Sequence, residues 1–210
     1  MRNRTGDKRE RILEAAVRVF ARKGFFLSRV AEIAEAAGVA DGTIYLYFKN
    51  KDDLLISIFE DRIDALCDAI EARLAGIADP AEKLRRIIDI QLGIVAEHRD
   101  LAEVLTINLR QSSRFLKQYA APKFNRYLDV IAGVVSEGQD AGVFRRDVPP
   151  RHFARALFGA LDGMTLTWVI GKGAPERLEK AAASAATILI EGIRGRTSGA
   201  PRASGKGDAT

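Results

Sequence analysis

Residues 33–51, with the sequence IAEAAGVADGTIYLYFKNK, decide the fold. They hold two short helical segments joined by a tight turn at Gly38-Val39. The first segment begins near Ser28, which can cap it, and its apolar residues Val30, Ile33, Ala34 and Ala37 recur at helical spacing. The second begins near Ala40 and ends around Tyr47 or Phe48. This pattern predicts a helix-turn-helix.

A helix-turn-helix places its second helix in the major groove of DNA while its first helix crosses the backbone. Ala34 and Gly38 are small where the two helices must approach, and Val39 and Ile44 can fill the core between them. Many helical hairpins also turn at a glycine, so the turn alone leaves a plain hairpin open.

The rest of the chain also has the pattern of helices, which predicts an all-α fold. One helix is expected from Asp7 to Lys23, stopped by Gly24, and a long one opens at Asn50-Lys51-Asp52-Asp53. Asp79-Pro80 starts a helix that runs to about His98. Further helical segments are expected at about 100–112, 113–140, 151–171 and 175–194. We expect the chain to divide into a DNA-binding domain at 1–50, an effector-binding and dimerisation domain at 51–195, and a disordered tail at 196–210.

Composition is that of a soluble protein, with 47% hydrophobic and 29% charged residues among 210. No apolar run approaches the roughly 20 residues needed to cross a bilayer, and the first 30 residues lack a signal-peptide core. We therefore expect a cytoplasmic protein without a membrane partner. Cys67 is the single cysteine, so no intrachain disulfide forms.

Positive charge is concentrated at the N-terminus. Residues 1–51 carry 11 Lys and Arg against 6 Asp and Glu, while the chain as a whole has a net charge of +5. A basic head on a near-neutral body suits phosphate binding, although a solvated basic surface would show the same charge.

Residues 8–60 resemble the DNA-binding head of the TetR family. The shared features are Gly24-Phe25, the Ala37-Gly38-Val39 turn, Gly42-Thr43-Ile44-Tyr45, and the exit Phe48-Lys49-Asn50-Lys51. The resemblance implies a homodimeric, ligand-responsive transcriptional repressor that binds palindromic double-stranded operator DNA. It also implies dimerisation through about 151–171 and 175–194. Apolar positions fit helices there: Phe153, Ala156, Leu157, Ala160, Leu161, Met164 and Leu166 in the first, and Ala182, Ala185, Ala186, Leu189 and Ile193 in the second.

Candidate DNA contacts follow from position and chemistry. Asp41, Gly42 and Thr43 begin the recognition helix, the end that reaches base edges. Tyr45 and Tyr47 can donate to phosphates, or one of them can pack in the core. Lys51 is expected to clamp a phosphate at a helix N-terminus, and the resemblance adds Ser28 and Arg29. Ala40 and Asp41 depart from the Ser-Lys pair common in the family, so Asp41 either reads cytosine or caps a helix.

Residues 40–59, 108–112 and 158–169 resemble more particularly the FadR-like regulators of fatty-acid degradation in that family. This resemblance implies a long-chain acyl-coenzyme A effector and control of fatty-acid degradation genes. An acyl tunnel needs apolar walls and a cationic mouth. The candidate ligand contacts are Leu105, Leu109, Arg110, Arg114, Tyr127, Val130, Ile131 and Trp168, with Lys117, Lys123 and Arg126 as further cations. The alternative is a repressor of the same type that responds to a drug or other hydrophobic ligand and controls efflux. The stretch Asn108–Ser112 argues mildly against this alternative.

An enzyme and a membrane-surface protein are the rival classes. The only histidines, His98 and His152, lie far apart, and no metal-ligand spacing, phosphate loop or nucleophile motif accompanies them. We therefore expect no catalytic residues, no metal and no cofactor. Asp162, an acid within an apolar helix, would be the catalytic candidate of an enzyme, but we expect it to pair with an arginine or line the pocket. The helix-turn-helix explains the basic N-terminus better than a membrane surface does. The expected mechanism is ligand binding that splays the heads, with the helix starting at Lys51 as lever.

Overall fold

The computed structural model describes residues 4–112, 122–171 and 173–195. Within these ranges every named element is a helix, which confirms the all-α fold. The candidate cations Arg114 and Lys117, and the tail at 196–210, lie outside the described residues.

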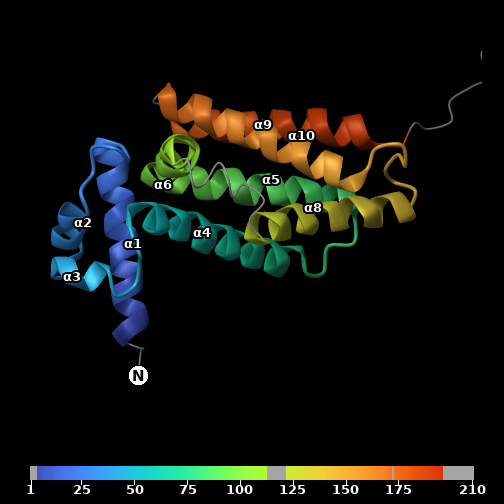
Figure 1. The fold of residues 1–210 in the computed structure, drawn as a ribbon. Coiled ribbons are helices and arrows are strands. Elements are labelled where there is room, and N and C mark those ends of the chain that lie inside the picture. The colour runs from blue at the N-terminus through green and yellow to red at the C-terminus, as the bar shows by residue number, and fades with distance from the viewer. Residues whose placement is uncertain (1–3, 113–121, 172, 196–210) are drawn as a thin grey trace, which may run out of the picture.

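The N-terminal head contains α1 (Arg4–Lys23), α2 (Val30–Ala37) and α3 (Asp41–Ile44) (Figure 1). Apolar side chains that are almost fully buried form its core: Ile12, Leu13, Ala16, Phe20, Ile33, Ala34, Ile44 and Phe48. Gly24 follows α1 with φ 77° and Gly38 follows α2 with φ 64°, left-handed values that favour glycine. Both expected helix stops are therefore confirmed.

The start of α2 differs from the expectation. Its N-cap is Arg29, whose backbone N–H donates to the Glu32 side chain, and Ser28 is not the cap. The Ser28 hydroxyl instead donates to the Gly24 carbonyl at 2.7 Å and is buried. The last carbonyls of a helix have no partner within it, and the Ser28 hydroxyl supplies one for the Gly24 carbonyl that follows α1.

The recognition helix α3 is shorter than expected. It ends at Ile44, and residues 45–47 continue as turns in which the Tyr47 and Phe48 amides both donate to the Ile44 carbonyl. Tyr45 and Leu46 therefore project from a tightened turn.

Helix α4 (Lys51–Leu74) connects the head to the body (Figure 1). Asn50 is its N-cap, as the sequence indicates, and its side chain accepts from the Asp53 amide at 2.8 Å. Cys67 lies on its buried face with no exposed surface, and burial raises the pKa of this thiol to about 11.

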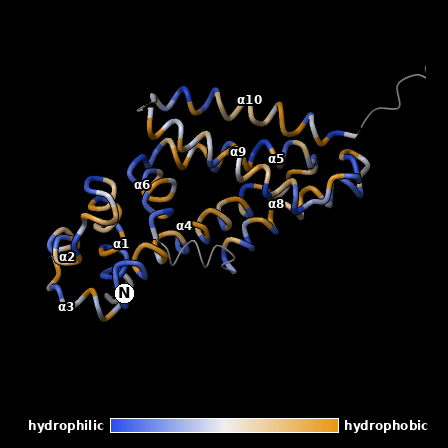
Figure 2. The backbone as a smooth tube through the Cα atoms, turned by 45° about the horizontal axis from the view of Figure 1, so that its top comes forward, coloured by the Kyte–Doolittle hydropathy of each residue, from blue (hydrophilic) through white to orange (hydrophobic). Residues whose placement is uncertain are grey.

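The body continues with α5 (Pro80–Glu97), α6 (Arg99–Glu103), the π-helix η1 (Val104–Asn108) and the 3₁₀-helix η2 (Leu109–Gln111). It is completed by α8 (Pro122–Asp140), α9 (Pro150–Ile170) and α10 (Pro175–Ile193). Helix α10 packs on α5 and α9, while α8 packs on α4, α5 and α9. Hydrophobic and hydrophilic positions alternate along α4 and α10, as Figure 2 shows.

The segment expected as a single helix at 100–112 is divided into three short helices of different type, α6, η1 and η2.

Much of the expected apolar face of α9 and α10 lies inside the protomer. Phe153, Leu157 and Leu161 are buried, as are four α10 residues: Ala182, Ala185, Ala186 and Ile193. Ala156, another residue of the expected face, is exposed, and with Gly159 it lies on the outward face of α9.

Helix α9 is also long and apolar enough to cross a membrane: an 18-residue stretch of it has a mean hydropathy of 1.2, and 39% of that stretch is buried. The expectation that no run approaches this length was therefore wrong for α9. Core helices meet the same criterion, and α9 packs on α8 and α10.

Candidate DNA-binding surface and effector cavity

The exposed side of α3 and the following turn form the candidate DNA-binding surface. Asp41 and Gly42 are exposed at the N-terminal end of α3, and Thr43 is half-buried beside them. Tyr45 is 58% exposed, whereas Ile44 points into the core with 2% exposure. This arrangement presents the expected base-reading end of the helix to solvent.

Tyr45 and Tyr47 have different surroundings. Tyr47 is half-buried against the core, and its ring centroid lies 6.4 Å from that of Phe48. Tyr47 therefore has a packing role in the core, whereas Tyr45 is the more exposed of the two tyrosines.

Leu46 is a surface residue that the sequence reasoning missed. It is 81% exposed, next to Tyr45 on the same turn. Its apolar type alone does not distinguish it from a core residue, and the tightened turn directs it outward. An exposed leucine here can contact thymine methyl groups in the major groove.

Lys51 lies inside the junction between α1, α2 and α4. Its ammonium donates to the carbonyls of Phe25 at 2.7 Å, Phe26 at 3.2 Å and Ser28 at 2.9 Å. It also lies 4.6 Å from the Phe25 ring centroid. An ammonium has three donors, and all three are engaged. Burial lowers the pKa of Lys51, and Asp52 opposes this shift. Lys51 therefore does not extend outward as the phosphate clamp that the sequence predicts. The side chain of Arg29, by contrast, is exposed to solvent.

A largely apolar cavity of about 290 Å³ lies within the body. Helices α4, α5, α6, α8 and α9 and the segments η1 and η2 all contribute to its wall. Three aromatic rings meet there: Phe124 lies 4.8 Å from Phe158, edge to face, and 6.3 Å from Phe59. Its other lining residues are Arg62, Ile63, Ala65, Leu66, Gln91, Ile94, Val95, His98, Leu101, Ala102, Leu105, Thr106, Leu109, Arg110, Asp162 and Thr165.

Three of the expected ligand residues line this cavity, namely Leu105, Leu109 and Arg110. Four others do not: Tyr127, Val130, Ile131 and Trp168. Tyr127 is fully buried and donates to Gln91, which does line the cavity, and burial raises the pKa of its phenol. The Trp168 indole donates to the Ala174 carbonyl at 3.0 Å beneath the guanidinium of Arg99.

Arg110 and Asp162 form an ion pair at the cavity wall. Arg110 also donates to the Thr106 carbonyl, so one guanidinium links η1 to α9. Burial raises the pKa of Asp162, an effect that Arg110 opposes. Both expectations for Asp162, an arginine partner and a place in the pocket, are confirmed.

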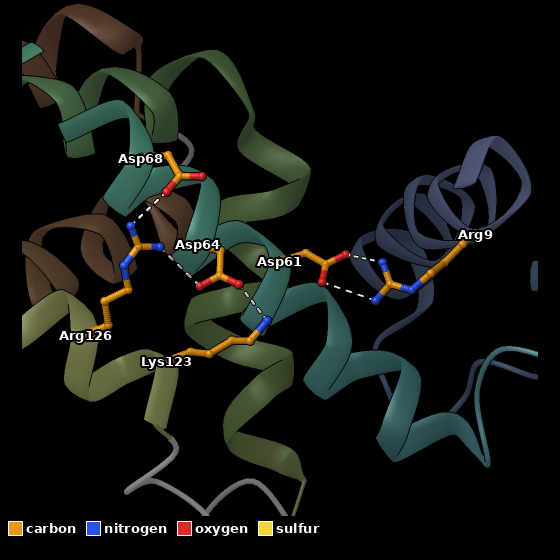
Figure 3. Close-up of polar contacts among 6 residues, drawn as sticks. All are labelled: Arg9, Asp61, Asp64, Asp68, Lys123 and Arg126. Carbon is orange, nitrogen blue, oxygen red and sulfur yellow. Dashed lines mark hydrogen bonds and ion pairs between the residues drawn. The ribbon is translucent and has the colours of Figure 1, made fainter. Parts of the chain in front are cut away.

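Two of the other expected cations, Lys123 and Arg126, lie in the described part of the chain, and acids of α4 neutralise both (Figure 3). Lys123 pairs with Asp64 at 2.6 Å, and Arg126 pairs with Asp68 at 2.8 Å and with Glu71 at 3.0 Å. They fasten α8 to α4 and do not line the cavity. Figure 3 also shows Arg9 of α1 paired with Asp61 of α4.

No group of three metal-binding side chains gathers among the residues that the structure describes. His98 is exposed at the edge of the cavity, and His152 is exposed near the start of α9.

Comparisons with known proteins cover both the head and the body. Residues 12–58 match the family model of bacterial regulatory proteins, tetR family, and residues 59–192 match that of the YsiA-like protein, C-terminal region. The fatty acid metabolism regulator protein of Bacillus subtilis (strain 168) is 35% identical over 185 residues, covering 88% of this chain and 95% of that protein.

Two solved structures are similar over nearly the whole chain. The fatty acid degradation regulator FadR from Bacillus halodurans has a TM-score of 0.82 at 34% identity, covering 90% of this chain and 97% of its own. FadR from Bacillus subtilis in complex with stearoyl-CoA has a TM-score of 0.80 at 35% identity, covering 88% and 98%. The helix-turn-helix head, the helical body and these similarities together show that the chain belongs to the TetR family of bacterial transcriptional regulators and is homologous to its FadR-type regulators of fatty-acid metabolism.

Proposed function

We propose that this protein is a cytoplasmic, homodimeric repressor that releases its operator when a long-chain acyl-coenzyme A binds in the body, and that it controls fatty-acid degradation genes. The observation that carries the proposal is the apolar cavity with Arg110 in its wall. Support comes from the homologous FadR of Bacillus subtilis, solved in complex with stearoyl-CoA.

The proposed operator contacts are Arg29, Asp41, Gly42, Thr43, Tyr45 and, in part, Tyr47, together with Leu46. All of these residues are exposed on the head except Thr43 and Tyr47, which are half-buried; this placement supports the roles, as does the positive charge of residues 1–51. Ser28 and Lys51 are proposed to position this surface from within, because their donors are engaged by backbone carbonyls.

The acyl chain is the proposed occupant of the cavity. Its volume of about 290 Å³ is near the lower end of the roughly 300–1,000 Å³ typical of ligand pockets. A space of this size suits the chain but not the whole coenzyme. The nucleotide is therefore proposed to remain outside, with Arg110 at the transition from apolar to polar surroundings.

Fluorescence anisotropy on promoter DNA tests the effector. We expect stearoyl-CoA to release the DNA, while free coenzyme A does not. Release by a neutral hydrophobic drug but not by stearoyl-CoA would favour the alternative effector class instead.

A pair of variants links the release to the cavity. Leu105→Trp places bulk in its wall, whereas Ile107→Trp changes a half-buried residue of the same π-helix that does not line it. Loss of the stearoyl-CoA response in the first variant only, with unchanged DNA affinity, is the expected result.

The proposed dimer interface is the outward face of α9 and α10. Gly163 and Ala156 of α9 and Ile188 of α10 are exposed there, Ile188 by 69%. Small residues let helices approach closely, and two such pairs can form a four-helix interface.

Sedimentation velocity can test this interface with matched arginine substitutions. Gly163→Arg is expected to give monomers. Gly133→Arg, on an exposed face of α8, is the control, because a Cβ atom at either glycine would meet no atom within 4 Å. A dimeric Gly163→Arg protein would place the interface elsewhere.

A further inference from the structure

The irregular segment formed by η1 and η2 lies between the effector cavity and the head. Leu105, Thr106, Leu109 and Arg110 line the cavity. Asn108, within the same segment, does not line it and is 98% buried, with 2% exposure. Its side-chain oxygen accepts a hydrogen bond of 2.6 Å from the backbone amide of Phe25 in the head. One short segment therefore contacts both the cavity and the head.

Phe25 is held from two sides. Its amide is bound by Asn108 of the body, and its carbonyl is bound by Lys51, the first residue of α4. Its ring lies under the Lys51 ammonium and 5.6 Å from the ring of Phe20 in α1. Because Phe25 follows α1 and precedes α2, these contacts fix how the helix-turn-helix sits on the body. Of these contacts, the one from Asn108 comes from the segment that lines the cavity.

The backbone around Asn108 is suited to a change of register. In η1 the Leu109 amide donates to the Val104 carbonyl, five residues earlier, as in a π-helix. Conversion of one such turn to α-helix would rotate Asn108 by roughly a quarter turn and withdraw its oxygen from Phe25. The Arg110 guanidinium opposes this conversion, because it holds both the Thr106 carbonyl and Asp162 of α9.

We propose that Asn108 is the positioning residue that couples the cavity to the DNA-binding head, through its hydrogen bond to the Phe25 amide. An effector that displaces the side chains of η1 or draws Arg110 from Asp162 moves Asn108 and frees the head. The named effector rests on the proposed function; the link from Asn108 to the head does not depend on it. Ser112 provides a second contact of this segment, donating to Asp52 of α4 at 2.7 Å.

The test compares Asn108→Ala with Gln139→Leu. Gln139 donates to the Arg145 and Val148 carbonyls in the body, so its loss removes two half-buried hydrogen bonds without touching the head or the cavity. Operator affinity is measured with and without saturating stearoyl-CoA. We expect Asn108→Ala to lower the ligand-free affinity on the order of ten-fold and to bring the ratio of the two affinities close to one, while Gln139→Leu keeps both. A folded Asn108→Ala protein with wild-type affinity and ratio would overturn the proposal.

Hydrogen exchange of the Phe25 amide gives a readout that a general loss of stability does not imitate. In the wild type this amide should exchange slowly, like the Gly24 amide, which donates to the Phe20 carbonyl. Asn108→Ala, or saturation of the wild type with stearoyl-CoA, should speed the exchange of Phe25 by about ten-fold or more and leave Gly24 unchanged. If Asn108→Ala does not fold, the wild-type exchange still decides: release of DNA with Phe25 fully protected would refute the coupling.

Failure of the effector and failure of the coupling are distinguishable. If wild-type protein ignores stearoyl-CoA, the proposed effector is wrong. The ligand-free affinity and the Phe25 exchange of Asn108→Ala then still support or overturn the role of Asn108.

Discussion

Replacing Lys51 by methionine separates a structural role from a phosphate contact. Methionine keeps the length of the side chain but removes three hydrogen bonds to carbonyls and the contact with the Phe25 ring. Hydrogen bonds to charged groups contribute roughly 1.5–3 kcal/mol each, and a cation–π contact about 0.5–1 kcal/mol. These values are not additive, and Lys51 is only half-buried. We therefore expect the free energy of unfolding to fall by about 2–4 kcal/mol.

Two measurements on Lys51→Met decide between the roles. Guanidinium unfolding gives the stability, and operator affinity over a series of salt concentrations gives the number of phosphates neutralised. Each phosphate contact contributes about 0.9 to the slope of log affinity against log salt. We expect an unchanged slope for Lys51→Met, whereas Arg29→Met should lower the slope by about 0.9 with little change in stability. A Lys51→Met protein of normal stability whose slope falls by that amount would refute this reasoning.

Three further results are expected. Leu46→Ala should weaken operator binding by about 1–2 kcal/mol without changing the salt slope, because the lost contact is apolar; anisotropy checks both. Gly138→Ala should lower the free energy of unfolding by about 1–3 kcal/mol, since its Cβ would lie 2.1 Å from the Phe144 ring. Gly133→Ala on the same helix, with open space, should stabilise by about 0.5–1 kcal/mol, and equal effects in denaturant unfolding would contradict the clash. Asp162→Asn should unfold at neutral pH no more easily than wild type. The raised pKa of Asp162 means that the folded state binds this proton more tightly than the unfolded state does. The free energy of unfolding of the wild type should therefore rise relative to that of Asp162→Asn as the pH falls toward that pKa. Melting curves across pH would show the opposite trend if the ion pair with Arg110 outweighed the effect of burial on the pKa.

Helix ends that depend on local chemistry could be predicted from the sequence. Gly24 and Gly38 end helices with positive φ, and Asn50 and Asp79 cap the helices that follow them. Each feature acts within a few residues, so a short window contains its cause. Ser28 is an exception: its partner, the Gly24 carbonyl, is only four residues away, but the sequence does not show whether a serine between two helices turns back to the first helix or caps the second.

The irregular segment at 104–111 depends on contacts that are distant in sequence. Asn108 bonds to Phe25, 83 residues away, and Arg110 pairs with Asp162, 52 residues away. Residue spacing within 100–112 does not contain these partners, so it predicts one ordinary helix.

Cavity residues and core residues share the same amino-acid types, which limits prediction of the effector site. Leu105 lines the cavity, whereas Ile131 is fully buried in the core. Periodicity shows that both face inward but not which interior space they face. Likewise, the charge of Lys123 or Arg126 does not reveal that acids of α4 neutralise it.

The surroundings of Cys67 make the natural protein a ready background for spectroscopic labelling. This thiol is fully buried and its pKa is raised to about 11, so it stays protonated at neutral pH and out of reach of maleimide reagents. A cysteine introduced at exposed Lys49 on the head would then be the reactive thiol. Spin or dye labels there can report the distance between two heads directly, with the native cysteine left in place.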